Sequence, residues 1–173
     1  MRVDTSAPAA PTISSVTDDV GTVQGSVANG GVTNDTVPLL RGTAEAGSTL
    51  TLLANGVSIG TTLVDASGNW TFSPSPALGE GTYSFTATAT DAAGNTGATS
   101  NAFAITVDTT PPSVPVITGI VDDVAPNTGT VANGGVSNDG TPQLTGTASA
   151  NTAVAIYDNG VVIGSTTSNA SGA

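Results

Sequence analysis

Carboxylates are the side chains of this sequence whose type and spacing could do chemistry. The chain has 13 Asp and Glu residues, only two Lys and Arg residues, and no His or Cys. The usual general bases, thiolate nucleophiles and ligands for soft metals are therefore missing. Oxygen ligands remain, and Ca²⁺ binds six to eight of them. The candidate metal ligands are Asp18, Asp19, Asp35, Asp91, Asp108, Asp122, Asp123 and Asp139.

Several of these aspartates recur because the chain repeats itself at an offset of 104 residues. The run at residues 27–32 returns at 131–136, and Gly42-Thr43-Ala44 returns as Gly146-Thr147-Ala148. A period as long as a whole domain is typical of tandem independent modules rather than of a short-period solenoid. The sequence predicts a complete module at residues 4–107 and the first part of a second at residues 108–173.

Period-2 alternation predicts that each module is all-β. In residues 82–91, Tyr83, Phe85, Ala87 and Ala89 alternate with Ser and Thr, so one face is expected in the core and the other in solvent. The size and strand number of the first copy predict a seven-stranded immunoglobulin-like β-sandwich, and the second copy holds the first four strands only. The expected strands cover residues 11–16, 38–44, 49–54, 57–64, 69–73, 82–91 and 102–107.

The turns between these strands agree with the same fold. Asn55-Gly56 and its repeat Asn159-Gly160 predict tight hairpins. Tyr83 stands where such sandwiches often place a tyrosine that bonds back to the preceding loop. Trp70 and Phe72 share inward parity, so the only Trp is expected to fill the core rather than to stack on a ligand.

The sandwich topology predicts where the carboxylates gather. The chain enters at one pole and leaves at the other, so Asp18, Asp19, Asn34, Asp35 and Asp108 are expected near the C-terminal pole. The same reasoning places Asp4, Glu45, Asp65 and Asp91 at the N-terminal pole.

Crowded carboxylates repel one another unless a cation lies between them, which favours Ca²⁺ at the joints between modules. The alternative is that these aspartates, above all Asp65 and Asp91, only cap turns. No complete EF-hand loop or glycine-rich nonapeptide repeat supports the metal hypothesis, so it depends on the clustering alone.

The full set of motifs resembles a known family. Asp-Asp-Val, Asn-Gly-Gly, Leu-x-Gly-Thr-Ala, Asp-Ala-Ser-Gly-Asn-Trp and Tyr-x-Phe-x-Ala-x-Ala-x-Asp-Ala-Ala-Gly-Asn resemble the bacterial immunoglobulin-like repeats of giant biofilm-associated, type I secreted adhesins of the RTX type. The resemblance covers the chain after residue 2. It implies a secreted or cell-surface protein that contains many repeats and depends on calcium for rigidity.

Two classes of function follow. The first is a non-catalytic extender module that supports cell adhesion and biofilm formation, and the alternative is a module that itself binds a carbohydrate or receptor. An enzyme is not expected, because adjacent carboxylates on one loop cannot flank a substrate. The net charge of -11 disfavours nucleic acid and membrane insertion. Neighbouring repeats are the expected partners.

The second copy lacks counterparts of Trp70, Phe85 and Ile105, so its apolar residues are expected to lack partners. Such a partial sandwich exposes unpaired strand edges and should not be stable alone. Completion by another molecule, including a second copy of this chain, strand exchange, or additional chain in a longer parent protein would each solve this problem.

Overall fold

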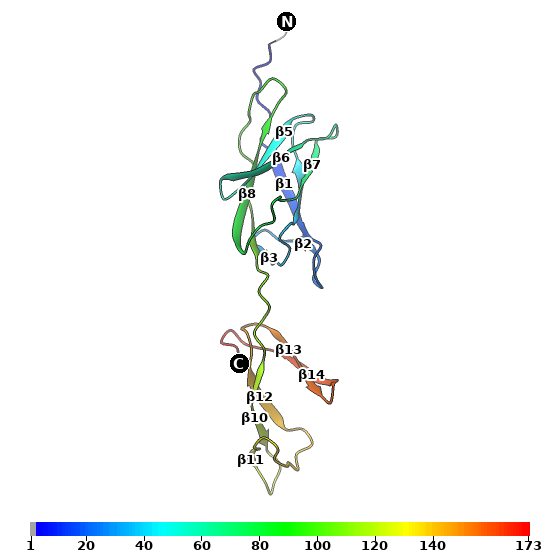
Figure 1. Ribbon diagram of the computed structural model, residues 1–173, viewed down its shortest axis with the longest axis vertical. Helices are drawn as coiled ribbons and strands as arrows, with labels where there is room; N and C mark the ends of the chain where they lie inside the picture. Colours follow the sequence, from blue (N-terminus) through cyan, green and yellow to red (C-terminus); the bar gives the residue numbers. More distant parts are fainter. Residues whose placement is uncertain (1–2) are drawn as a thin grey trace. The chain divides into compact units, whose positions relative to one another are not determined.

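The computed structural model describes residues 3–173, which form two compact units (Figure 1). The first unit ends at Thr109 and the second runs from Thr110 to Ala173. The described residues form β-strands and no helix, as the sequence predicts. The strands of the first unit are β1 (Thr12–Asp18), β2 (Gly25–Val27), β3 (Gly31–Thr33), β4 (Leu39–Thr43), β5 (Thr49–Ala54), β6 (Val57–Leu63), β7 (Asn69–Phe72), β8 (Gly81–Thr90) and β9 (Phe103–Val107).

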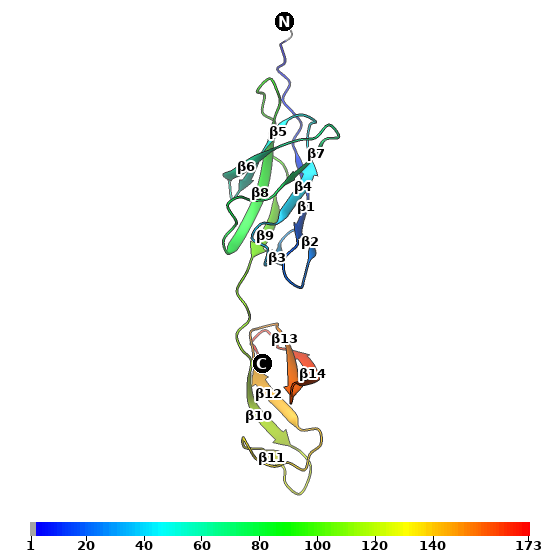
Figure 2. The same ribbon diagram turned by 45° about the vertical axis from the view of Figure 1, so that its right-hand side comes forward.

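Two sheets pack face to face in the first unit. One has the strand order β2-β1-β4-β7, and the other has the order β3-β9-β8-β5-β6. Figures 1 and 2 show these sheets as the two layers of a sandwich. The predicted immunoglobulin-like fold is confirmed.

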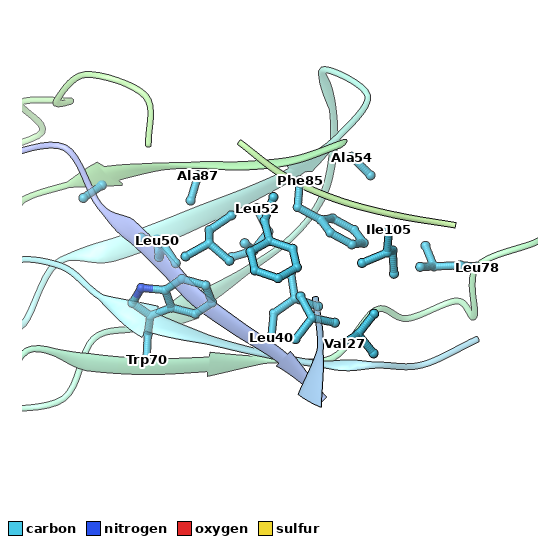
Figure 3. Packing of buried hydrophobic residues seen from close by; sticks show 14 of the residues in the cluster. Val27, Leu40, Leu50, Leu52, Ala54, Trp70, Leu78, Phe85, Ala87 and Ile105 are labelled. Carbon is cyan, nitrogen blue, oxygen red and sulfur yellow. The ribbon is translucent and has the colours of Figure 1, made fainter. Parts of the chain in front are cut away.

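The core of the sandwich is made by every second residue of the strands, those that face inward. Leu50 and Leu52 of β5, Phe85 of β8 and Ile105 of β9 are fully buried. Figure 3 shows them packed between the sheets with Trp70 of β7. Burial of each large apolar side chain contributes about 1.5–3 kcal/mol. The inward parity predicted for these positions, including Trp70, is confirmed.

Two glycines make room for the aromatic residues of β7. A Cβ atom on Gly42 would lie 2.5 Å from the Trp70 ring and 1.9 Å from the carbonyl oxygen of Thr12. A Cβ atom on Gly60 would lie 2.8 Å from the Phe72 ring. The indole ring of Trp70 therefore packs directly against Gly42, and the phenyl ring of Phe72 packs directly against Gly60.

The first unit has two more strands than the sequence predicts. β2 and β3 each contain three residues and lie in the glycine-rich connection between β1 and β4. A three-residue strand is too short to show a period of two. β3 also pairs in parallel with β9, far away in the sequence, and no local pattern indicates such a pairing.

The predicted turns form as expected. Asn55 and Gly56 both have positive φ values, 51° and 79°, and they connect Ala54 of β5 to its partner Val57 of β6. These angles fit the hairpin turn that an Asn-Gly pair favours. The Tyr83 hydroxyl donates a 3.1 Å hydrogen bond to the carbonyl oxygen of Gly79, which confirms the predicted link to the preceding loop.

The second unit repeats the early part of the first. Its strands are β10 (Val116–Asp122), β11 (Gly129–Thr130), β12 (Gln143–Thr147), β13 (Ala153–Asp158) and β14 (Val161–Thr167). They form a sheet with the order β11-β10-β12 and a β13-β14 hairpin. Four of them match the four strands expected from the repeat, and β11 matches the short strand β2. In the described chain, all buried hydrophobic side chains belong to the first unit.

Candidate metal site

A buried carboxylate, Asp18, ends β1 at the C-terminal pole of the first unit. Its side chain is 7% exposed. Oδ1 accepts a 2.8 Å hydrogen bond from the Val20 amide, and Oδ2 accepts a 2.6 Å bond from the Thr33 hydroxyl. Asp18 is thus held by a turn on its own chain segment and by a hydroxyl of β3.

The Thr33 hydroxyl connects Asp18 to a second buried carboxylate, Asp35. It accepts a 3.0 Å hydrogen bond from the Asp35 amide, and Asp35 Oδ1 accepts a 2.7 Å bond from the Val37 amide. Asp35 is 2% exposed, and its Oδ2 atom is buried without a hydrogen-bond partner. A buried carboxylate oxygen without a partner is costly, and coordination of a hard cation would satisfy it.

The second unit builds the same arrangement at the repeated positions. Asp122 Oδ1 accepts from the Val124 amide at 2.9 Å, and Oδ2 accepts from the Ser137 hydroxyl at 2.7 Å. The Asp139 amide donates to Ser137 at 3.0 Å, and Asp139 Oδ2 is again buried without a partner. The Ser137 hydroxyl, followed by the Val124 amide, lowers the pKa of Asp122.

The interdomain segment approaches the same pole of the first unit. The backbone amide of Asp108 donates a 2.9 Å hydrogen bond to the carbonyl oxygen of Thr33. The structure therefore brings together Asp18, Asp35 and the backbone of Asp108, as the topology predicts. Asp19 and Asp123 are exposed, and they directly follow the buried Asp18 and Asp122 in the sequence.

The N-terminal pole holds a second group of acidic residues. Asp4, Glu45 and Asp91 line one shallow hollow there, together with the loop at residues 46–48. Asp91 Oδ1 accepts from the Ala93 and Asn95 amides, each at 2.8 Å. The bond from the Asn95 side chain makes the largest contribution to lowering the pKa of Asp91.

Asp65 caps a turn in the same manner as Asp91. Its Oδ1 atom accepts from the Ser67 and Asn69 amides at 2.8 Å, and the Asn69 amide bond is the largest cause of its lowered pKa. Asp65 is not among the residues that line the hollow. The turn-capping role considered for Asp65 and Asp91 is confirmed, and metal binding by Asp91 stays a prediction.

Neither pole forms a complete metal site from acidic side chains of one unit. Within residues 3–173, no three His, Cys, Asp or Glu side chains converge as a metal-binding group. Asp18 and Asp35 would supply part of a coordination shell, so a cation would need backbone carbonyls, water or a neighbouring module to complete it.

Thr33 and Ser137 are the residues of this arrangement that reasoning from the sequence missed. The signal was present, because Thr33-Asn34-Asp35 returns as Ser137-Asn138-Asp139 with the hydroxyl retained. The hydroxyl that links the two carboxylates belongs to a Thr or Ser residue, so the pattern of Asp residues does not identify it.

The family described as bacterial Ig-like domain matches residues 9–109, which is more than half of the chain. A comparison with curated proteins found no match. The described residues include no helix with the length and apolar character needed to cross a membrane.

Proposed function

Because the chain belongs to the bacterial Ig-like domain family, we propose that it is a non-catalytic extender module of a repetitive bacterial surface adhesin. Domains of this family are commonly extracellular structural modules. In this role each module adds length, and the array projects a distal binding region that supports cell adhesion and biofilm formation.

The observation that carries this proposal is the separation of the two chain ends of the first unit along β8. Gly81, the first residue of β8, pairs with Val107, where the chain leaves the sandwich. At the other end of β8, the Asn95 side chain donates a 3.2 Å hydrogen bond to the carbonyl oxygen of Asp4. β8 has 10 residues. At about 3.3 Å per residue, one module adds about 30 Å of reach.

Calcium at the joint is the second part of the proposal. Asp18 and Asp35 lie at the pole from which the chain leaves, and the Asp108 backbone binds to the same pole. A Ca²⁺ ion held by Asp18, Asp35 and Asp108, and completed by a neighbouring module, would turn a hinge into a stiff joint. The unpartnered Oδ2 atoms of Asp35 and Asp139 support a role for a cation at both copies.

The calcium hypothesis is tested by thermal unfolding of Asp35→Asn. The fluorescence of the only Trp, in the core of the first unit, reports the unfolding of that unit alone. At a calcium concentration of 100 times Kd, binding stabilises the native state by about 2.7 kcal/mol. The wild type should therefore melt at a higher temperature in calcium than in EGTA, and Asp35→Asn should not.

Asp19→Asn is the matched control for Asp35→Asn. It removes the same charge from an exposed position at the same pole. Asp19 is not one of the three residues that hold the ion in this proposal, so the variant should keep the response to calcium. An equal response from wild type and Asp35→Asn would contradict the site. In that case the module would still add length to the array, but calcium would not stiffen the joint through Asp35.

A further inference from the structure

The segment that leaves the first unit stays bound to its C-terminal pole for two residues after β9. The Asp108 amide donates a 2.9 Å hydrogen bond to the Thr33 carbonyl oxygen. The amide and the hydroxyl of Thr109 both donate to Glu80 Oε1, at 3.3 Å and 2.7 Å. Hydrogen bonds to a backbone carbonyl and to one carboxylate oxygen therefore hold Asp108-Thr109 on this pole.

The loop that carries Glu80 is itself fixed. The Tyr83 hydroxyl donates a 3.1 Å hydrogen bond to the carbonyl oxygen of Gly79, the residue before Glu80. The Leu78 amide donates a 2.8 Å bond to the Thr36 carbonyl oxygen, and the Leu78 side chain is buried. The backbone of Glu80 is therefore held in place beside the departing chain.

The N-terminal pole holds the segment that enters the first unit. The Asn95 side chain donates through Nδ2 to the Asp4 carbonyl oxygen at 3.2 Å and to Asp91 Oδ2 at 2.8 Å. Further along this segment Pro8 is buried, and a Cβ atom on Gly97 would lie 2.2 Å from the Pro8 carbonyl oxygen. The entering segment therefore lies against the turn that carries Asn95.

The entering and departing segments are the same part of the repeat, because Asp108-Thr109 is the repeat of Asp4-Thr5. The bonds at the C-terminal pole use the amide of the Asp and the amide and hydroxyl of the Thr. The bond at the N-terminal pole uses the carbonyl oxygen of the Asp. These are different atoms, so two modules can hold one Asp-Thr pair at the same time.

We propose that the Asp-Thr pair between two complete modules is a shared clamp, bound by Thr33 and Glu80 of the module before it and by Asn95 of the module after it. This inference rests on the proposed extender function. Both modules attach to the same two residues, so no free linker separates their points of attachment. Pro111-Pro112 further restrict the backbone that follows. The clamp limits bending of the joint without calcium, and calcium adds to this effect.

The partner that fits the C-terminal pole is therefore a following module that begins with Asp-Thr, as both copies in this chain do. The Thr hydroxyl makes the shorter of the two bonds to Glu80, at 2.7 Å. A hydrogen bond to a charged acceptor is stronger than one between neutral groups. A Val in place of this Thr would have nearly the same shape and could not make the bond.

Amide hydrogen exchange of Thr109, followed by NMR in the whole chain in EGTA, tests the bonds to the preceding module. Glu80 and Thr109 are exposed, so water competes for both groups, and Glu80→Ala should speed this exchange about three- to tenfold. Glu80→Gln removes the same charge and keeps the Oε1 acceptor, so its exchange should stay close to that of the wild type. Equal acceleration in both variants, or none in Glu80→Ala, would overturn the clamp and would not affect the calcium hypothesis.

A tandem of residues 4–112 fused to residues 9–107 tests the clamp from both sides. Residues 4–107 contain all buried hydrophobic side chains of the described chain, so each module has its own core. One variant carries Glu80→Ala in the first module and Asn95→Ala in the second, which removes bonds from both sides of the shared Asp-Thr pair. The matched control carries Asn95→Ala in the first module and Glu80→Ala in the second, so its composition is the same and its clamp is intact.

The flexibility of the joint is measured as the distribution of distances between two spin labels in EGTA. The chain has no Cys, so Thr61→Cys at the exposed Thr61 of each module provides the only two labelling sites. The distribution should be at least about 1.5-fold wider in the variant than in the control, because the segment between its modules becomes a flexible linker. Equal widths would overturn the clamp. The expected difference in EGTA, together with a wild-type width that calcium does not change, would support the clamp and contradict only the calcium-dependent joint.

Discussion

Replacement of Thr33 by Val removes the hydroxyl that joins the two buried aspartates at the C-terminal pole. The two side chains have nearly the same shape, so the change removes hydrogen bonds and little packing. The lost bonds are the 2.6 Å bond to Asp18 Oδ2 and the 3.0 Å bond from the Asp35 amide. Thr33 is 3% exposed, Asp18 is 7% exposed and Asp35 is 2% exposed, so access of water to the abandoned groups is restricted.

The expected loss of stability follows from the Asp18 Oδ2 atom and the Asp35 amide, which both lose their hydrogen-bond partner. A buried donor or acceptor left without a partner costs about 1–3 kcal/mol, and more when it is charged. An amide and a carboxylate oxygen together should therefore cost about 3 kcal/mol. For a domain of about 100 residues, 1 kcal/mol corresponds to about 4 °C, so Thr33→Val should melt about 12 °C lower than the wild type.

Urea and thermal unfolding, both followed by the emission of Trp70, measure this loss in the first unit alone. Thr33→Ser is the matched control, since Ser137 shows that a serine hydroxyl makes both bonds in the second unit. Thr33→Ser should lose about 1 kcal/mol for the missing methyl group. If Thr33→Val were as stable as Thr33→Ser, the hydroxyl would not hold this pole together.

Two further substitutions test the core and a turn. Gly42→Val places a Cβ atom 1.9 Å from the Thr12 carbonyl oxygen and against the tryptophan ring, so it should destabilise the first unit by about 3 kcal/mol or more, measured by urea unfolding; a loss below 1 kcal/mol would contradict this packing. Hydrogen bonds, chiefly from the Asn95 side chain, lower the pKa of Asp91 from 3.8, so its ionised form stabilises the fold above that pH. This contribution is lost as the pH falls from about 3.8 through the lower folded-state pKa. Asp91→Asn should therefore show a weaker decrease in melting temperature between about pH 5 and pH 2 than the wild type, and an unchanged acid dependence would contradict the capping role.

Patterns that act over a few residues predicted most of the fold. The alternation of Tyr83, Phe85, Ala87 and Ala89 reflects a strand with one buried face, and that face is where the structure places them. The Asn55-Gly56 turn needs positive φ at both residues, which few other residue pairs allow. β2 and β3 could not be predicted, because three residues are too few to show a period of two, and β3 also pairs with β9, far away in the sequence.

The sequence predicts where the candidate site lies, but it does not predict the hydrogen bonds that connect its residues. Topology alone brings Asp18, Asp35 and Asp108 to one pole. The Thr33 hydroxyl between the two aspartates depends on a register of β3 that no local pattern sets. The unpartnered Oδ2 atom of Asp35 depends on burial by the surrounding loops, and composition gives no measure of that burial.

Small-angle X-ray scattering from a tandem of two complete modules is the most direct test of a calcium-stiffened extender. Residues 4–112 would be fused directly to residues 9–107, because residues 108–112 are the repeat equivalents of residues 4–8 and the native joint contains this segment once. This tandem would be measured in calcium and in EGTA. We predict a maximum dimension in calcium close to the summed length of two modules, and a shorter, broader distribution of distances in EGTA. Identical scattering in the two conditions would show that calcium does not stiffen the joint.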